Sequence, residues 1–231
     1  EAIPSAGIWP QGPDVAPSQN PAIAKTLDDP ALQGPGMRAI VVAQNGRIIG
    51  ERYGESFKAE TPLLGWSMTK TVNAAIIGTL VRDGRLKLEQ DGVLALWAGD
   101  ARARITLANL LSMSPGLAFN EDYGDVTDVT RMLFLEGDMA LFATEKPLEA
   151  KPGLKFNYSS GTAVLLSRIW QNAIGVESLG YPQSALFAPL GMTSAVFEPD
   201  QSGTFVGSSY LYATARDWAR FGEFLRHSGS V

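Results

Sequence analysis

An Asn-Gly dipeptide at residues 45–46 is the feature that most restricts how this chain can fold. It separates two runs rich in β-branched and other apolar residues, at 37–44 and 47–53. Asn-Gly favours the positive φ angles of a type I′ turn, whose twist matches that of two antiparallel strands. A run with helical spacing of its apolar residues follows at 71–82 and is closed by a glycine. The sequence therefore predicts a β-hairpin that leads into a helix.

A serine and a lysine lie three residues apart at the start of this helix. Ser67 and Lys70 belong to the segment Gly65-Trp66-Ser67-Met68-Thr69-Lys70, and helical spacing places their side chains next to each other. A serine hydroxyl is a poor nucleophile until a base removes its proton, and a lysine serves as that base only when its amine is neutral. Taken alone, the pattern favours the plainer interpretation of an N-cap serine and a solvent-exposed lysine. A catalytic role for the pair therefore needs support from motifs elsewhere in the chain.

The chain divides into three regions of different character. Residues 1–36 are rich in proline and glycine and predict an extended arm over the surface, with one short helical patch at 22–27. Residues 37–84 contain the hairpin and the helix after it, which we expect to form the N-terminal part of an α/β domain. The pattern then changes to short helices divided by Gly and Pro turns, so we expect a mainly helical domain over 85–231. The expected fold class is therefore α/β plus all-α.

Apolar spacing and capping residues predict helices within the last region. They lie at about 107–111, after the cap Thr106, and at 126–136, 163–173 and 213–226. The helix at 213–226 is amphipathic. Its expected inward residues are Trp218, Phe221, Phe224 and Leu225, and its expected outward residues are Arg216, Asp217, Arg220 and Glu223.

Composition excludes several classes of protein. The formal charge of −5, from 19 basic and 24 acidic residues, and the lack of a basic block argue against a nucleic-acid partner. The sequence contains no apolar run near the roughly 18 residues of a membrane span, and the lack of cysteine excludes disulfides and zinc–thiolate sites. The single histidine, His227, lies in a polar segment, so neither a Ser-His-Asp triad nor a multi-histidine metal site is expected. We expect no metal and no cofactor.

Several segments together resemble one known family. Ser67-Met68-Thr69-Lys70 at the start of a helix and Tyr158-Ser159-Ser160 on a later loop make the chain similar to the class C β-lactamase-like family of penicillin-recognising serine hydrolases. The resemblance implies a β-lactamase-like fold, in which helices flank an antiparallel sheet and a second domain is mainly helical. It covers about residues 37–226, and the family's connecting segments are matched in order at 105–117, 189–192 and 212–221.

The resemblance implies a role for each motif residue. In this family the motif serine is acylated, and the lysine and tyrosine share the proton transfers, during hydrolysis of an amide, ester or lactam. Carried over, Ser67 is the nucleophile, Lys70 is its activating base, and Tyr158 is the general acid/base that faces the leaving group. Many relatives have Asn where this chain has Ser160. A hydroxyl can still bond Lys70 or the substrate, but it lacks the paired donor and acceptor of an amide, which weakens the case for β-lactam specificity.

The segments Gly65-Trp66-Ser67 and Tyr158-Ser159-Ser160-Gly161 are most similar to the subgroup that hydrolyses short amides such as aminohexanoate oligomers, together with related carboxylesterases. In that subgroup a tyrosine on a mobile loop closes over the substrate. The loop at 119–125 supplies a candidate tyrosine and acidic residues for a substrate ammonium group, although a solvated acidic loop is an equally good interpretation. The expected substrate contacts are Trp66, Tyr123, Asp125 and Ser160, and Glu121 and Asp122 are further candidates for the ammonium group.

The motifs predict a serine hydrolase that cleaves a small amide or ester through an acyl-enzyme on Ser67. A β-lactamase or D-alanyl-D-alanine peptidase of the penicillin-binding kind is the alternative within the family. An alternative of another class is a penicillin-receptor-like sensor that is acylated without turnover. The first residue is Glu1 instead of Met, which fits a cleaved export signal or a trimmed chain. We expect a periplasmic or secreted protein, with the cytoplasm left open.

The resemblance also implies strands that this chain does not supply. In the family the sheet is completed by later strands, one of which carries a Lys/His-x-Gly motif beside the serine, and no such motif follows Tyr158. Two strands are too few for a stable sheet. We therefore expect a C-terminal segment or a second chain to complete the sheet and to provide the second donor of the oxyanion hole.

Overall fold

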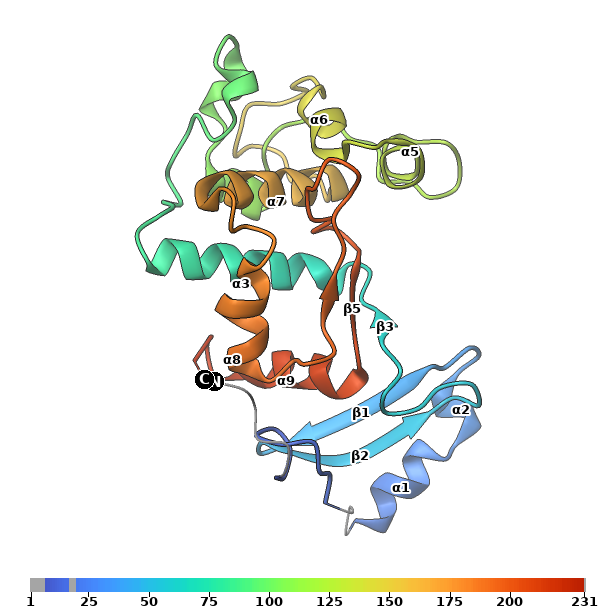
Figure 1. Cartoon of the computed structure of the whole chain (residues 1–231). Coiled ribbons are helices and arrows are strands. Elements are labelled where there is room, and N and C mark those ends of the chain that lie inside the picture. The colour runs from blue at the N-terminus through green and yellow to red at the C-terminus, as the bar shows by residue number, and fades with distance from the viewer. Residues whose placement is uncertain (1–6, 17–19, 231) are drawn as a thin grey trace. The chain divides into compact units, whose positions relative to one another are not determined.

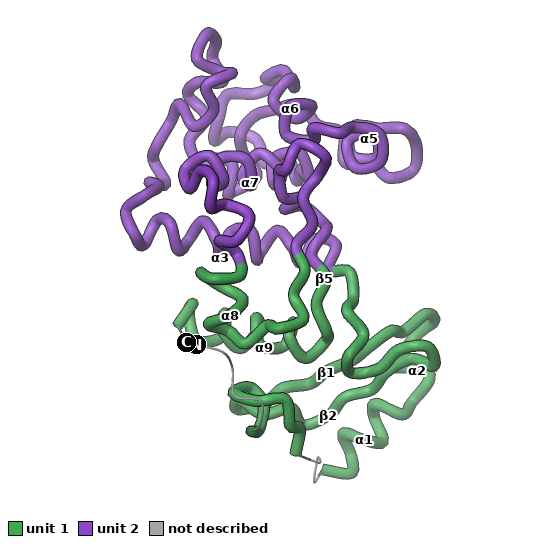
Figure 2. The backbone as a smooth tube through the Cα atoms, viewed as in Figure 1, with its two compact units in different colours: residues 1–64, 183–196, 212–231 green, residues 65–182, 197–211 purple. Residues whose placement is uncertain are grey.

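The structure is a computed structural model that describes residues 7–16 and 20–230. It contains two compact units, drawn in different colours in Figure 2. The sequence predicts a domain boundary near residue 84, whereas the chain leaves unit 1 after residue 64 and returns to it twice. The domain division drawn from the sequence stays a prediction. Unit 1 comprises residues 1–64, 183–196 and 212–231, and unit 2 comprises residues 65–182 and 197–211.

The predicted hairpin is confirmed in unit 1 (Figure 1). Strand β1 (Ala39–Gln44) pairs antiparallel with β2 (Arg47–Tyr53), and Ala39 lies opposite Tyr53. The turn residues 45 and 46 have φ angles of 49° and 69°. These angles lie in the left-handed region that a type I′ turn requires, which explains why Asn and Gly occupy the turn.

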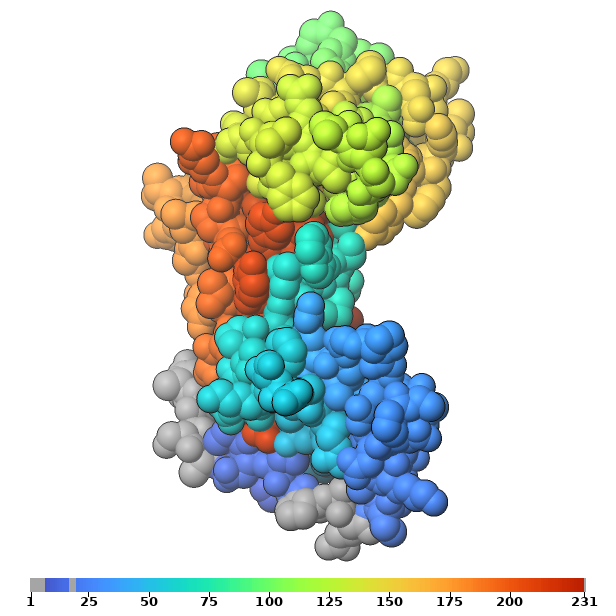
Figure 3. All heavy atoms as spheres, turned by 90° about the vertical axis from the view of Figure 1, so that its right-hand side faces the viewer, coloured from blue at the N-terminus to red at the C-terminus, as the bar shows by residue number. Residues whose placement is uncertain are grey.

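Two short helices replace much of the extended arm that the sequence predicts. Helix α1 (Pro21–Leu27) extends the expected helical patch, whereas α2 (Pro30–Gln33) has no counterpart in the prediction. Leu27 of α1 is buried, and a Cβ atom on Gly50 of β2 would come within 2.7 Å of its side chain. The blue atoms of these segments lie side by side in Figure 3. Residues 1–6 and 17–19 of the predicted arm lie outside the described residues.

Helix α9 (Ala215–Arg226) follows the predicted boundaries, but two of its expected outward residues are buried. Asp217 and Arg220 are 2% and 8% exposed and form an ion pair of 2.6 Å. The Asp217 carboxylate also accepts two hydrogen bonds from Ser194, and Arg220 donates to two backbone carbonyls near the N-terminus. Hydrophobic periodicity cannot anticipate this arrangement, because an interior tolerates charges whose polar atoms all have partners. Leu225, expected inside, is exposed.

The rest of unit 1 packs around this helix and the hairpin. A π-helical turn, η3 (Gln183–Phe187), continues into the short helix α8 (Ala188–Leu190), which contacts α9. The guanidinium group of Arg216 on α9 forms an ion pair of 2.6 Å with Glu51 on β2. Although burial acts to raise the pKa of Glu51, the charge and hydrogen bonds of Arg216 hold it below the usual range.

Unit 2 is built mainly from helices. The capping box of Thr106 and Asn109 begins one of them, as the sequence predicts from Thr106, and the helix predicted at 163–173 lies inside α7. Helices within the described ranges, 7–16 and 20–230, are all too short or too polar to cross a membrane. The elements of unit 2 are α3 (Met68–Arg82), η1 (Ala95–Trp97), η2 (Ala101–Arg104), α4 (Leu107–Leu111), α5 (Asp128–Leu135), α6 (Met139–Thr144) and α7 (Ser160–Ile174).

A second small sheet forms from three very short strands, in the order β3-β5-β4. Strand β3 (Leu63–Leu64) pairs antiparallel with β5 (Leu211–Ala213), and β4 (Val196–Phe197) lies on the other side of β5. Within unit 2, the N–H of Gly65 donates to the carbonyl of Leu211 at 2.8 Å. This bond anchors the backbone just before Ser67. Strands this short carry no alternating pattern, which is why the sequence did not predict them.

Candidate active site

Ser67 stands where the chain enters α3. Its backbone is helical (φ −64°, ψ −12°), and its side chain makes no capping hydrogen bond with the described residues. The preceding residue, Trp66, has a φ angle of 44°, which non-glycine residues adopt rarely and at a cost in free energy. The Ser67 Oγ atom lies 3.2 Å from the Nζ atom of Lys70, one turn further along the helix. Ser67 thus stands at the N-cap position of α3, but its hydroxyl contacts Lys70 and does not cap the helix.

The Lys70 amine contacts oxygen atoms from three separate segments of unit 2. Besides Ser67 Oγ, its Nζ atom lies 3.2 Å from Ser160 Oγ and 3.0 Å from the carbonyl oxygen of Ser208. Ser208 lies 138 residues away in the sequence and belongs to no recognisable motif. These contacts hold the end of a long, flexible side chain in one position next to the Ser67 hydroxyl.

Tyr158 lies on the loop just before α7. The next residue, Ser159, caps that helix by accepting a hydrogen bond from the N–H of Thr162 at 3.0 Å. The centroid of the Tyr158 ring is 4.8 Å from Lys70 Nζ, close enough for attraction between a cation and the ring face. The Tyr158 side chain is 40% exposed. The structure thus brings Ser67, Lys70 and Tyr158 together, while their catalytic roles stay predictions.

Glu121 joins this cluster in a way that the sequence analysis missed. One carboxylate oxygen accepts from the backbone N–H of Ser160 at 2.7 Å, and the other accepts from the Ser160 hydroxyl. Ser160 is fully buried, and it is the first residue of α7. The first N–H groups of a helix lack partners within the helix and attract nearby acceptors, but no spacing in the sequence identifies Glu121, 39 residues earlier, as that acceptor. The contact differs from the predicted role of Glu121 toward a substrate ammonium group.

The predicted substrate contacts have different positions. Burial raises the pKa of Tyr123, a hydrogen bond with Ser160 acts in the opposite direction, and the nearby Glu121 charge adds to the rise. The hydrogen bond with Ser160 places the Tyr123 hydroxyl next to the cluster of Ser67, Lys70 and Tyr158. Asp125 instead shapes its own turn, where its carboxylate accepts from the next backbone N–H at 2.7 Å. Trp66 adjoins the nucleophile and is 45% exposed, so its ring is available to a bound molecule.

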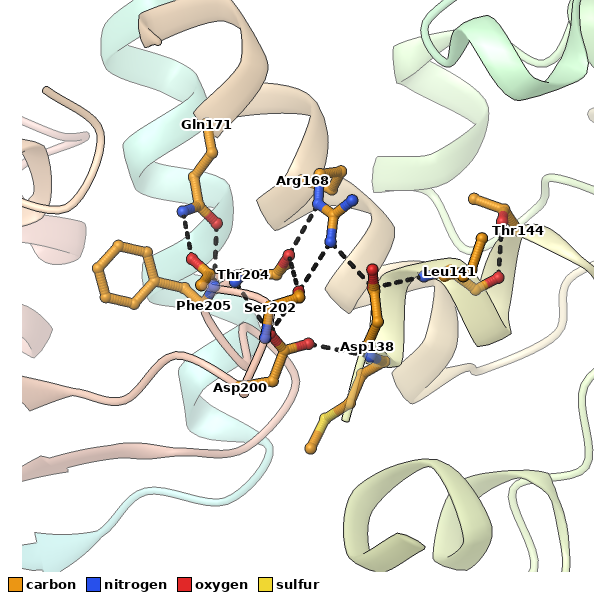
Figure 4. A network of polar contacts seen from close by, with 11 residues as sticks. Asp138, Leu141, Thr144, Arg168, Gln171, Asp200, Ser202, Thr204 and Phe205 are labelled. Atoms are coloured by element: carbon orange, nitrogen blue, oxygen red, sulfur yellow. Dashed lines mark hydrogen bonds and ion pairs between the residues drawn. The ribbon is translucent and has the colours of Figure 1, made fainter. Parts of the chain in front are cut away.

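A polar network holds the segment that leads to Ser208 (Figure 4). The Asp200 carboxylate accepts from the N–H groups of Ser202 and Thr204, at 2.9 and 3.0 Å, and closes a tight turn. Arg168 of α7 points toward this turn, donates to Thr204 Oγ1 at 2.7 Å, and also donates to Asp138 at 2.9 Å. Because the turn is tied to α7, the Ser208 carbonyl a few residues later keeps a defined place beside Lys70.

Comparison with known families decides which group these motifs belong to. The family model described as Beta-lactamase matches residues 24–231. The chain belongs to the beta-lactamase family. The β-lactamase-like fold expected from the Ser67–Lys70 and Tyr158–Ser160 motifs is therefore confirmed, and solved structures of the family share that fold.

A curated relative of this beta-lactamase-family chain is the 6-aminohexanoate-dimer hydrolase of Paenarthrobacter ureafaciens. The two are 24% identical over 205 residues, which is 83% of this chain and 52% of the relative. The chain therefore spans about half the length of that relative.

Solved structures of the family superimpose on most of the chain. A Bacillus anthracis protein provisionally assigned as a 6-aminohexanoate-dimer hydrolase has a TM-score of 0.74 at 24% identity, over 84% of this chain and 55% of that one. A Bacteroides dorei protein provisionally assigned as a beta-lactamase has a TM-score of 0.68 at 28% identity, over 84% and 58%. A penicillin-binding protein from Bacillus halodurans has a TM-score of 0.66 at 18% identity, over 83% and 70%.

Proposed function

We propose that this chain carries the nucleophile of a serine hydrolase that cleaves a small amide or ester through an acyl-enzyme on Ser67. The observation that carries the proposal is the 3.2 Å contact between Ser67 Oγ and Lys70 Nζ. General acid–base catalysis needs the base within about 2.6–3.2 Å of the atom that loses its proton. The Tyr158 ring also lies beside the amine and is partly exposed, which supports a role for Tyr158 at the leaving group.

The proposed reaction combines the Ser67–Lys70 contact with the role that the family resemblance implies for Tyr158. The Ser67 proton passes to Lys70 as Oγ bonds to the substrate carbonyl carbon, and the carbonyl electron pair moves onto oxygen. The backbone N–H of Ser67, at the start of α3, is a suitable donor to that oxygen. Tyr158 then protonates the leaving amine or alkoxide and recovers its proton from the Lys70 ammonium. Water hydrolyses the acyl-serine by the same transfers in reverse, which releases a carboxylic acid.

The surroundings of Ser67 favour a substrate that is apolar near the scissile bond. Trp66, Tyr123 and Tyr158 are 45%, 50% and 40% exposed, so large rings are available to pack against a bound chain. The acidic residues predicted to meet a substrate ammonium group already accept hydrogen bonds within the chain: Glu121 from Ser160, Asp122 from the N–H of Gly124, and Asp125 from the N–H of Val126. The similarity to a 6-aminohexanoate-dimer hydrolase supports a small amide, and esters of the same size offer the same carbonyl chemistry.

The test is the hydrolysis of p-nitrophenyl esters and short amides by the intact protein and its Ser67→Ala variant. Removing the nucleophile should lower turnover by about 10⁴–10⁶, and the covalent adduct of a slow substrate should vanish from intact-mass spectra. Ser56→Ala is a matched control, because Ser56 is an exposed turn residue in unit 1. Equal turnover by Ser67→Ala and the parent protein would overturn the proposal.

Turnover of β-lactams is the second candidate function. It is supported by the structural similarity to a protein provisionally assigned as a beta-lactamase, at 28% identity. The hydroxyl of Ser160 in place of an amide weighs against it. A chromogenic cephalosporin assay separates the two candidates, and an adduct that persists for hours without product would favour a sensor that is acylated but does not turn over.

A further inference from the structure

The contact between Glu121 and Ser160 decides which way the hydrogen bonds around Lys70 run. A carboxylate has acceptors only, so the Ser160 hydroxyl must donate its proton to Glu121. The backbone N–H of Ser160 donates to the other carboxylate oxygen at 2.7 Å. Toward Lys70, 3.2 Å away, the Ser160 oxygen therefore offers only lone pairs.

The remaining contacts of the Lys70 amine can be assigned in the same way. The Ser208 carbonyl, at 3.0 Å from Nζ, also accepts only. As an ammonium, Lys70 has three N–H groups, which match Ser67 Oγ, Ser160 Oγ and the Ser208 carbonyl. As a neutral amine it has two N–H groups and one lone pair. Ser160 and Ser208 take the two N–H groups, so the lone pair is left facing the Ser67 hydroxyl.

This assignment depends on Glu121. Without the Glu121 carboxylate, the Ser160 hydroxyl would be free to turn toward its other neighbours, Tyr123 and Lys70, and could donate to the Lys70 lone pair. The amine would then present an N–H to Ser67, which is the wrong direction for removing the serine proton. We propose that Glu121 is a positioning residue that, through Ser160, directs the Lys70 lone pair at Ser67. This inference rests on the proposed function and adds a residue to its machinery.

Glu121 also acts through its charge. The titratable groups that face the Lys70 amine are Tyr158, through its ring, and Glu121, through Ser160, with Tyr123 next to both. A nearby carboxylate favours the ammonium that forms when Lys70 accepts the Ser67 proton. Removing this charge should therefore slow acylation, the step in which that ammonium forms.

The experiment is a double-mutant cycle in the intact protein, with the acylation rate and KM as readouts. Glu121→Gln keeps the size and an acceptor for the Ser160 N–H, and should slow acylation about 10- to 100-fold, with less change in KM. Ser160→Ala removes the competing hydroxyl, so it should cost less than Glu121→Gln. In the Ser160→Ala background, Glu121→Gln should cost little more in rate at the pH optimum.

Glu145→Gln is the matched control, since Glu145 is an exposed carboxylate of the same unit at the end of α6. It should leave both the acylation rate and KM unchanged. If Glu121→Gln acylates like the parent, or if its rate loss persists undiminished in the Ser160→Ala background, the positioning role is wrong. If Glu121→Gln does not fold, the Ser160→Ala variant still tests the inference. A loss of about 100-fold or more in its acylation rate would overturn the positioning role of Glu121 without overturning the proposed function. Ser67→Ala, run in parallel, reports on the proposed function separately, and an active Ser67→Ala would overturn both.

Discussion

The indole Nε1 atom of Trp170 donates a 2.8 Å hydrogen bond to Oδ1 of Asn73, across 97 residues of sequence. Asn73 is on α3, one turn beyond Lys70, and Trp170 is on α7, the helix that begins just after Tyr158. Asn73 Oδ1 also accepts from Ser167 at 3.2 Å, and Asn73 Nδ2 donates to a backbone carbonyl of α7 at 2.9 Å. One buried amide thus sets how the two halves of the candidate site face each other.

Replacing Asn73 with Ala should destabilise the protein by about 2–4 kcal/mol, because buried polar groups of α7 would lose their partners. Urea unfolding measures the loss. The control is Asn172→Ala on the exposed side of α7, which should change the free energy of unfolding by less than about 0.5 kcal/mol. Similar stabilities for the two variants would show that the Asn73 amide does not hold the helices.

Replacing Gly207 with Ala should destabilise the protein and slow acylation together. A Cβ atom at this position would lie 2.2 Å from Ser167 Oγ and 2.3 Å from Asn73 Nδ2, so either these buried side chains or the backbone that carries the Ser208 carbonyl must shift. Overpacking of this kind costs about 1–3 kcal/mol. In contrast, a Cβ atom on Gly78 within α3 meets nothing within 4 Å, and Gly78→Ala should stabilise the protein by about 0.5–1 kcal/mol. A Gly207→Ala protein as stable and active as Gly78→Ala would contradict this account.

Replacing Lys70 with Ala should remove about 10²–10⁴ of the acylation rate, the usual contribution of a positioned base. Lys151→Ala, an exposed lysine of the same unit, removes the same charge and should behave like the parent. Retention of most of the rate by Lys70→Ala would assign the base to another residue.

The stability of the folded protein should fall between pH 10 and about 12 through Tyr53. Burial raises the pKa of Tyr53 from 10.0 to about 12, and the Glu51 carboxylate that accepts its hydroxyl proton at 3.0 Å adds to the rise. The unfolded chain ionises first, so this contribution to stability is complete below pH 10 and is lost as the pH rises through the folded pKa. Urea unfolding from pH 9 to 12 should show a shallower decline for Tyr53→Phe than for the parent. Equal slopes would contradict the raised pKa.

Local sequence signals determined the elements that depend on neighbours along the chain. Asn45-Gly46 predicted the hairpin because its φ angles are a property of the two residues themselves. Thr106 predicted the start of α4 because capping acts within one turn. The spacing of Ser67 and Lys70 predicted their contact because a helix places such residues side by side, and together with Tyr158 these residues indicated the family.

Tertiary structure decided the features that join distant segments. The Ser208 carbonyl beside Lys70, the Glu121 carboxylate on Ser160 and the Asn73 amide between α3 and α7 link residues 39 to 138 positions apart. Their partners are chosen by how helices pack, and no spacing rule relates them. The buried pair Asp217 and Arg220 escaped prediction for the same reason, since hydrophobic periodicity treats every charge as exposed. A polar side chain is placed by the partners that satisfy it, and only the folded chain supplies those partners.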